Sequence, residues 1–222
     1  MAEEPHAPVV TIAALYGASG SVIGARVAER LGVPLLDREI AAAAARRRGV
    51  SEQSVASVDE HPRSGFERLV SSLGRATPMG GGAGGGPIEQ LDVEERRLRG
   101  CIEEFLAESA VSGGVTIGRG GMVVLRSVAW ALHVHLGGPA EARLRVRMEL
   151  DGIDREAAKR RQKAEDGDRM GYVRRVYGVD GGDPALYHLM LDTTAIDVDT
   201  CVELIVSASR ARTRHPRSSE AI

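Results

Sequence analysis

The stretch that decides the fold is Val9–Gly24, which reads VVTIAALYGASGSVIG. Its first half is an apolar run rich in β-branched residues, which predicts a buried strand of a parallel sheet. A glycine turn from Gly17 to Gly20 follows, and apolar residues then recur at helical spacing until Gly32. A strand, a glycine turn and a helix in this order favour a phosphate-binding loop, because successive backbone N–H groups converge on one anion at a helix N-terminus. A tight connection without a ligand is the alternative interpretation.

This turn departs from the most specific phosphate-loop pattern, G-x-x-x-x-G-K-[ST]. No lysine follows the glycines, and Ser21 and Val22 stand where the pattern has Lys-Ser. Since such a lysine bridges the β- and γ-phosphates of a nucleotide, its absence is an objection to phosphoryl transfer from ATP. The sequence therefore predicts phosphate binding by backbone amides more directly than it predicts catalysis.

The rest of the chain predicts an alternation of strands and helices. We expect further strands at 33–36, 115–117, 130–136 and 187–193, and helices at 37–48, 88–112, 139–151, 154–175 and 198–209. Such alternation predicts a parallel sheet with right-handed crossovers, and ligands then bind beyond the carboxyl ends of the strands. The expected fold is a three-layer α/β/α architecture with a central parallel five-stranded sheet.

Composition limits the possible classes of protein. The chain has 222 residues, 43% of them hydrophobic, and its formal net charge of −2 argues against a surface built for nucleic acid. No apolar run reaches the roughly 18 residues that cross a bilayer. Cys101 and Cys201 lack metal-ligand spacing and are interpreted as reduced thiols, so we expect a cytoplasmic protein without a membrane segment.

Glycine and arginine clusters mark the expected domain limits. Residues 79–86 contain six glycines in eight positions, which predicts a flexible insert at about 76–87. Residues 210–222 are rich in Arg, Ser and Thr and predict a disordered tail. We therefore expect a single domain over residues 1–209.

Short motifs from Val9 to Ile205 combine into one pattern. They are YGASGSVIG at 16–24, LDREI at 36–40, IGRG at 117–120, Asp166-x-x-Arg169-x-x-Tyr172, Tyr177-Gly178, Asp183-Pro184, Tyr187 and Asp192-Thr193. In this order and at these spacings the chain resembles the cytidylate-kinase-like family, a branch of the nucleoside monophosphate kinases. The family's arginine in the glycine turn is replaced here by Ser21. The resemblance implies a P-loop nucleoside-kinase-like fold with a helical lid at about 152–180.

The same resemblance implies ATP-dependent phosphoryl transfer to a CMP-like nucleoside monophosphate, with Mg²⁺. The residues expected to bind the ATP phosphates are Gly17, Ala18, Ser19, Gly20, Ser21 and Val22, with Ser21 also beside the Mg²⁺. The residues expected to bind the acceptor are Asp37, Arg38, Arg119 and Tyr172. The residues expected to act in catalysis are Arg119, Arg160, Arg161, Asp166 and Arg169.

Two of these assignments also rest on the residues themselves. Arg119 lies between glycines at the end of a predicted strand, where its guanidinium is placed for bidentate phosphate contact; an ordinary surface arginine is the alternative. Arg160, Arg161 and Arg169 lie in a charged segment that is suited to close over phosphates, or equally to form a solvated helix face. Asp166 is a candidate for orienting such an arginine or for holding Mg²⁺ through water.

Other functions stay open at this point. A catalytically impaired nucleotide-binding regulator or sensor fits the missing lysine. A short-chain dehydrogenase fits the glycine turn, but none of the tyrosines has a lysine four residues later. His133 and His135 alternate along one predicted strand without an evident third metal ligand. The expected partners are small nucleotides, and both a monomer and a homodimer remain possible.

Overall fold

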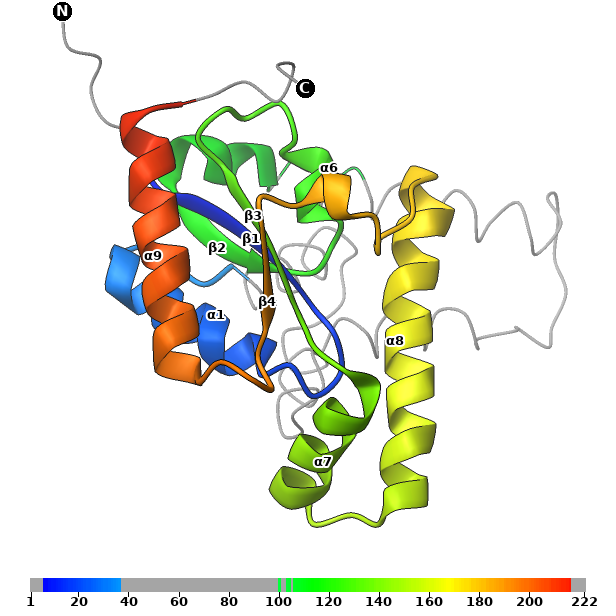
Figure 1. The fold of residues 1–222 in the computed structure, drawn as a ribbon. Helices are drawn as coiled ribbons and strands as arrows, with labels where there is room; N and C mark the ends of the chain where they lie inside the picture. The colour runs from blue at the N-terminus through cyan, green and yellow to red at the C-terminus, as the bar shows by residue number, and fades with distance from the viewer. Residues whose placement is uncertain (1–5, 37–99, 101–102, 105, 217–222) are drawn as a thin grey trace, which may run out of the picture. The chain divides into compact units, whose positions relative to one another are not determined.

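The computed structural model describes residues 6–36, 100, 103–104 and 106–216 (Figure 1). The chain divides into two compact units, residues 1–36 with 106–222 and residues 37–105. The sheet belongs to the first unit, and the following description concerns that unit. Asp37, Arg38 and the glycine-rich insert lie outside the described residues. A single domain over residues 1–209 with this insert stays a prediction.

The described strands form one parallel sheet in the order β2-β1-β3-β4, which confirms the predicted α/β class. The strands are β1 (Val9–Ala14), β2 (Gly114–Ile117), β3 (Leu132–Gly137) and β4 (Leu189–Asp192). The prediction of a fifth strand at 33–36 is wrong, because Leu35 forms only an isolated bridge to Val115. Pro34 has no N–H to donate, so this pairing uses the Pro34 carbonyl and the Leu36 N–H.

Helices follow the strands in the described part of the chain. They are α1 (Gly20–Leu31), α6 (Gly121–Val124), α7 (Ala140–Asp151), α8 (Arg155–Tyr177), the 3₁₀ helix η1 (Pro184–Leu186) and α9 (Val198–Arg214). Asp154 starts α8 by accepting a hydrogen bond of 2.8 Å from the Ala157 N–H. Gly152, left-handed at φ 62°, ends α7, so α7 and α8 form a helical hairpin (Figure 1). In the described part of the chain, no helix is both long and apolar enough to cross a membrane.

The two faces of the sheet differ in chemistry. One face is apolar and packs against α1 and α9, where burial of each large aliphatic side chain contributes about 1.5–3 kcal/mol. The residues of this core include Val10, Ile12, Ile23, Val27, Val134, Leu136, Ile205 and Val206. The opposite face carries the buried polar side chains Thr11, Thr116, His133 and His135. Helix α6 starts against this polar face, since a Cβ at Gly121 would lie 3.0–3.2 Å from Thr11 and Thr116.

A hydrogen-bonded pair joins the central strands on the polar face. Thr11 and His133 are partners in the β1–β3 register, and the Thr11 hydroxyl lies 2.9 Å from His133 Nδ1. The backbone N–H of His133 donates to His188 Nδ1 at 3.0 Å, and the two imidazole rings stack at 4.8 Å. These contacts satisfy polar groups that would otherwise oppose burial.

The prediction that a disordered tail begins at Arg210 is also wrong for the first residues of that segment. Helix α9 continues to Arg214, five residues beyond the predicted end. Arg212 Nε and Nη2 donate to the carbonyls of Ala131 and Ala129, both at 2.8 Å. Arginine-rich composition suggested a solvated segment, but these two bonds fasten the last turn of α9 beside the start of β3.

The first prediction concerns acid sensitivity. Burial, then the charges of His188 and Arg212, lower the pKa of His133 to about 3, and burial and Arg212 lower the pKa of His188 to about 4. In the unfolded chain both titrate near 6.5, so between about pH 6.5 and 4 the unfolded state binds more protons. The free energy of unfolding is therefore expected to fall as the pH drops through this range, as measured by urea unfolding.

A histidine variant makes this test specific. His188→Gln is expected to flatten the pH dependence, because it removes one imidazole whose pKa is lowered and one group that lowers the pKa of His133. Met190→Leu on strand β4, which removes an exposed side chain that does not titrate, is the control and keeps the wild-type dependence. Equal pH dependence in wild type and His188→Gln would contradict the assignment.

Candidate functional site

The turn after β1 has a backbone shape that requires glycine. Gly17 and Ser19 are left-handed, with φ of 81° and 54°. A Cβ at Gly17 would lie 2.3 Å from the carbonyl oxygen of Arg143, and a Cβ at Gly20 would lie 2.3 Å from the Ala14 Cβ. Cβ atoms essentially never approach this closely, so a side chain at either position would force its neighbour to shift. The turn thus lies at the carboxyl end of β1, in close contact with α7.

The amino end of α1 keeps its positive partial charge. Ser19 is the N-cap residue but its side chain makes no capping hydrogen bond, and the first turn contains no acidic residue. Ser21 and Val22 in this turn are exposed. Because the first N–H groups of a helix have no partner within the helix, this end offers backbone donors and a dipole to an anion.

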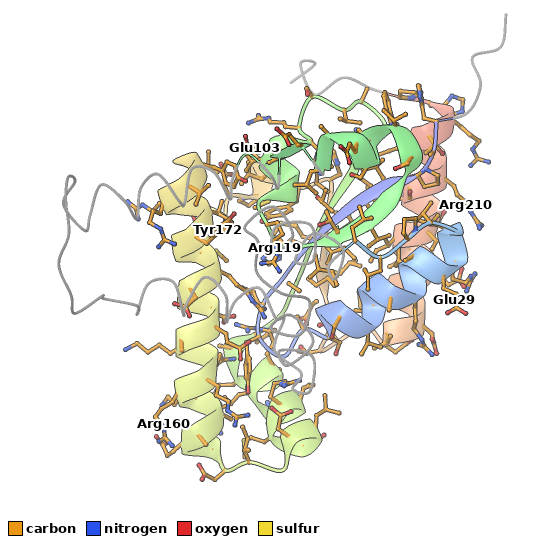
Figure 2. The ribbon with its side chains drawn as sticks, turned by 180° about the vertical axis from the view of Figure 1, so that it is seen from behind. Glu29, Glu103, Arg119, Arg160, Tyr172 and Arg210 are labelled. Atoms are coloured by element: carbon orange, nitrogen blue, oxygen red, sulfur yellow. The ribbon has the colours of Figure 1, made fainter. Side chains whose placement is uncertain are left out.

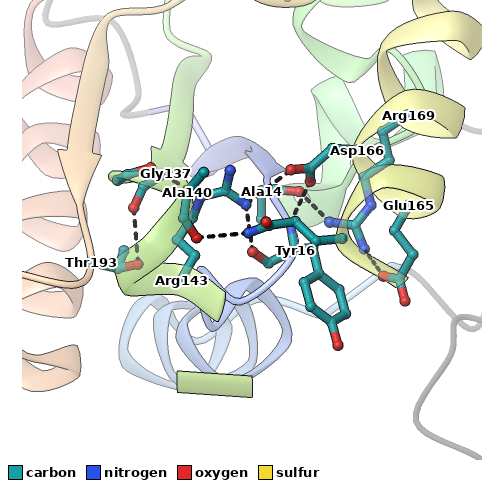
Figure 3. Close-up of polar contacts among 11 residues, drawn as sticks. Ala14, Tyr16, Gly137, Ala140, Arg143, Glu165, Asp166, Arg169 and Thr193 are labelled. Carbon is teal, nitrogen blue, oxygen red and sulfur yellow. Dashed lines mark hydrogen bonds and ion pairs between the residues drawn. The ribbon is translucent and has the colours of Figure 1, made fainter. Parts of the chain in front are cut away.

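Arg143 joins the loops that follow the two central strands (Figure 3). Its side chain is almost fully buried, with Nη1 donating to the Tyr16 carbonyl at 2.6 Å and Nε to the Gly138 carbonyl at 3.0 Å. The same Nη1 lies 3.0 Å from Asp166 Oδ2. One guanidinium therefore connects the turn after β1, the turn after β3 and helix α8.

Helix α8 adds further contacts to the first turn (Figure 3). Asp166 Oδ1 accepts a hydrogen bond of 2.8 Å from the Tyr16 N–H. Arg169, three residues later and on the same helix face, donates to the Ala14 carbonyl and pairs with Glu165 at 3.2 Å. These side chains fix the backbone on both sides of Leu15.

The turn after β2 is left-handed over three consecutive residues. Gly118, Arg119 and Gly120 have φ values of 73°, 61° and 67°. The left-handed conformation costs an arginine about 1–2 kcal/mol of free energy, so contacts with neighbouring residues must stabilise Arg119 in it. The Tyr177 hydroxyl donates to the Arg119 carbonyl at 3.3 Å, and a Cβ at Gly120 would lie 2.2 Å from the Tyr177 ring.

The family model of the cytidylate kinase-like family matches residues 9–195, which include both glycine turns and helix α8. The chain belongs to this family. A curated cytidylate kinase from Methanopyrus kandleri is 31% identical over 121 residues, which are 53% of this chain. The chain spans 62% of the length of that relative.

Two solved structures share the fold at low sequence identity. An uncharacterized protein from Eubacterium ventriosum matches with a TM-score of 0.61 and 16% identity, covering 92% of this chain and 99% of that chain. The protein TT1252 from Thermus thermophilus matches with a TM-score of 0.51 and 19% identity, covering 93% and 98%. At these identities the likeness shows the fold and not the reaction.

The structure brings some of the predicted site residues together and separates others. Asp166 and Arg169 hydrogen-bond to Tyr16 and Ala14, just before the glycine turn. Arg119 lies at the carboxyl end of β2. Tyr172 lies further along α8 in an apolar cluster with Met122, Val173 and Leu186. Figure 2 places Arg160 near the other end of α8, far from the labelled Arg119.

Arg161 is engaged near that same end of α8. It lies 3.5 Å from Asp151 at the end of α7, and Arg147 pairs with the same carboxylate at 2.9 Å. The catalytic roles of Arg160 and Arg161 stay predictions of the family pattern.

Sequence reasoning missed Arg143, the most buried arginine at this site. Arg143 donates to the backbone carbonyls of Tyr16 and Gly138. Every residue has a backbone carbonyl, so the sequence does not show which ones accept these hydrogen bonds. One signal for Arg143 was available in the sequence. Arg143 lies in the first turn of the helix after β3, and β3 ends at the same edge of the sheet as β1. The structure adds Arg143 to the candidate site of this family member.

The second prediction tests the close approach at Gly20. Gly20→Ala is expected to cost about 1–3 kcal/mol of unfolding free energy, because its methyl group meets Ala14 Cβ. Adding Ala14→Gly removes that methyl and is expected to recover most of the loss in urea unfolding. Gly167→Ala in helix α8 is the control, since a Cβ there would meet nothing within 4 Å. A Gly20→Ala protein as stable as wild type would disprove the contact.

The third prediction tests the Arg143–Asp166 pair. Asp166→Ala leaves a buried guanidinium without its carboxylate and is expected to cost about 2–4 kcal/mol. In the Arg143→Met background the same change is expected to cost much less, so a double-mutant cycle gives a clear coupling energy. Glu141→Ala, which breaks an exposed pair with Arg155, is the control and is expected to cost under about 1 kcal/mol. Additive losses would show that Arg143 and Asp166 act independently.

Proposed function

We propose that this chain transfers the γ-phosphoryl group of ATP to a nucleoside monophosphate, with CMP as the first acceptor to test. The observation that carries the proposal is the glycine turn between β1 and α1, whose left-handed backbone and uncapped helix end suit a phosphate group. Family membership supports the kinase class, and the relative named cytidylate kinase suggests the acceptor. A cytoplasmic location and a monomeric or homodimeric state go with this proposal.

The donor side of the site consists mainly of backbone. In the proposal the ATP phosphates lie against Gly17–Val22. The backbone there packs closely on its neighbours, since a Cβ at Gly17 would meet α7 and a Cβ at Gly20 would meet β1. Ser21 is exposed in the first turn of α1 and offers a hydroxyl oxygen, a ligand type that Mg²⁺ prefers. Mg²⁺ bound with ATP neutralises phosphate charge and orients the γ-phosphoryl group.

The acceptor and transfer sides consist of charged side chains. Arg119, held at the carboxyl end of β2, is proposed to bind the acceptor phosphate through its planar guanidinium. The other residues proposed to bind the acceptor are Asp37, Arg38 and Tyr172. The residues proposed to stabilise the transferring group are Arg160, Arg161 and Arg169. Positioning and electrostatic stabilisation provide most of the catalysis in such reactions.

Arg169 is our candidate for the positive charge that a phosphate-loop lysine supplies elsewhere. Its guanidinium donates a hydrogen bond to the carbonyl of Ala14, the last residue of β1 before the turn. Its ion pair with Glu165 is about a third exposed on the arginine side, at 34%, so solvent weakens it. A phosphate group with two negative charges competes well for this guanidinium.

The fourth prediction is the activity itself. A coupled assay with ATP, Mg²⁺ and each nucleoside monophosphate is expected to show turnover that chelation of Mg²⁺ abolishes. Arg169→Ala is expected to lower kcat by about a hundredfold, because transition-state charge loses one partner. Arg119→Ala is expected to raise the acceptor KM by about tenfold or more. Arg26→Ala, on the exposed α1–α9 surface, keeps wild-type kinetics.

Absence of turnover with every monophosphate, in protein shown by circular dichroism to be folded, would refute the proposed transfer. Calorimetry then separates the remaining possibilities. Tight nucleotide binding without turnover would identify a regulator or sensor that keeps the fold.

A further inference from the structure

Helix α8 contacts both glycine turns. Asp166 hydrogen-bonds to Tyr16 in the turn after β1, Arg169 hydrogen-bonds to Ala14 at the end of β1, and Tyr177 contacts the turn after β2. From Arg169 to Tyr177 the helix advances about 12 Å at 1.5 Å per residue. Because an α-helix of this length is stiff, its two attachments set the distance between the turns.

Tyr177 is well placed to hold the second turn. Its hydroxyl donates to the Arg119 carbonyl at 3.3 Å, and its ring lies where any side chain at position 120 would be. The ring is itself fixed, because it packs edge-on against Tyr172 at 6.2 Å and beside the buried Met122. The Tyr177 ring therefore leaves room only for glycine at position 120, and the Tyr177 hydroxyl helps to keep Arg119 in the left-handed conformation.

The conformation of Arg119 depends on this support. An arginine at φ 61° relaxes to the right-handed or extended region when nothing opposes it. Such a change rotates the direction in which the side chain leaves the backbone. Arg119 as a whole residue is 9% exposed in the present conformation, so its side chain is enclosed and its direction follows the backbone of residues 118–120.

We propose that Tyr177 is a positioning residue that holds Arg119 in the orientation needed to bind the acceptor phosphate. Through Tyr177, helix α8 sets the place of the acceptor turn relative to the turn that binds ATP. This inference rests on the proposed function, in which Arg119 binds the acceptor.

The fifth prediction compares two tyrosine variants. Tyr177→Phe keeps the ring and removes the hydroxyl, and is expected to raise the acceptor KM about threefold to tenfold while the ATP KM and the melting temperature stay near wild type. Tyr187→Phe is the matched control, because the Tyr187 hydroxyl also donates to a carbonyl, that of Gly181, and is not at either turn. It is expected to leave both KM values unchanged.

A double-mutant cycle separates positioning from stability. In the Arg119→Ala background, Tyr177→Phe is expected to have no further effect on the acceptor KM, since there is no guanidinium to position. Tyr177→Leu, which also removes the ring, is expected to raise the acceptor KM more than Tyr177→Phe does. Calorimetric titration with CMP gives the same comparison without turnover.

The outcomes distinguish this inference from the proposed function. Wild-type turnover with an unchanged acceptor KM in Tyr177→Phe would overturn the inference alone. Equal loss for the acceptor and ATP, or an undiminished effect in Arg119→Ala, would also overturn it, because Tyr177 would then act on general stability. A wild-type protein that neither binds nor phosphorylates any monophosphate would overturn the proposed function, and the inference with it.

Discussion

The buried Arg143 guanidinium is the interaction on which the candidate site depends. It binds the Tyr16 carbonyl, the Gly138 carbonyl and the Asp166 carboxylate, which belong to three different segments. A buried charge is costly unless its partners are all in place, so these segments cannot shift independently. The backbone of Arg143 also fills the space beside Gly17. The glycine turn after β1 is thus shaped by contacts from α7 and α8 as well as by its own glycines.

The sequence predicted the parts of this arrangement that have local signals. Strand β1, the glycine turn and α1 follow each other directly, and hydropathy with glycine spacing is enough to identify them. The Asp166-x-x-Arg169 spacing belongs to the predicted helix at 154–175, and in the structure both side chains reach the end of β1 and the residues that follow it. What remained hidden was long-range: Arg143 and Arg212 bind carbonyls, and carbonyl acceptors have no sequence signature. The arginine-rich end of α9 was therefore interpreted as a solvated tail.

The sheet shows a second limit of sequence reasoning. The apolar run of β1 suggested a strand covered by hydrophobic residues on both sides, yet Thr11 faces His133 in a buried polar layer. His133 and His135 alternate along β3 and share this face with Thr11, as their spacing indicates. Their cross-strand partners come from the register of β1 and β3, which no local pattern specifies.

The pairing of Thr11 with His133 also bears on how the chain is made. Strand β1 is synthesised well before its neighbours β2 and β3, which begin at Gly114 and Leu132. It therefore stays unpaired in the growing chain until those later strands have been made. Such non-local pairing slows folding and exposes apolar strands meanwhile. The glycine turn likewise precedes Arg143 in the chain, so its contacts with that residue form only after the Arg143 segment has been made.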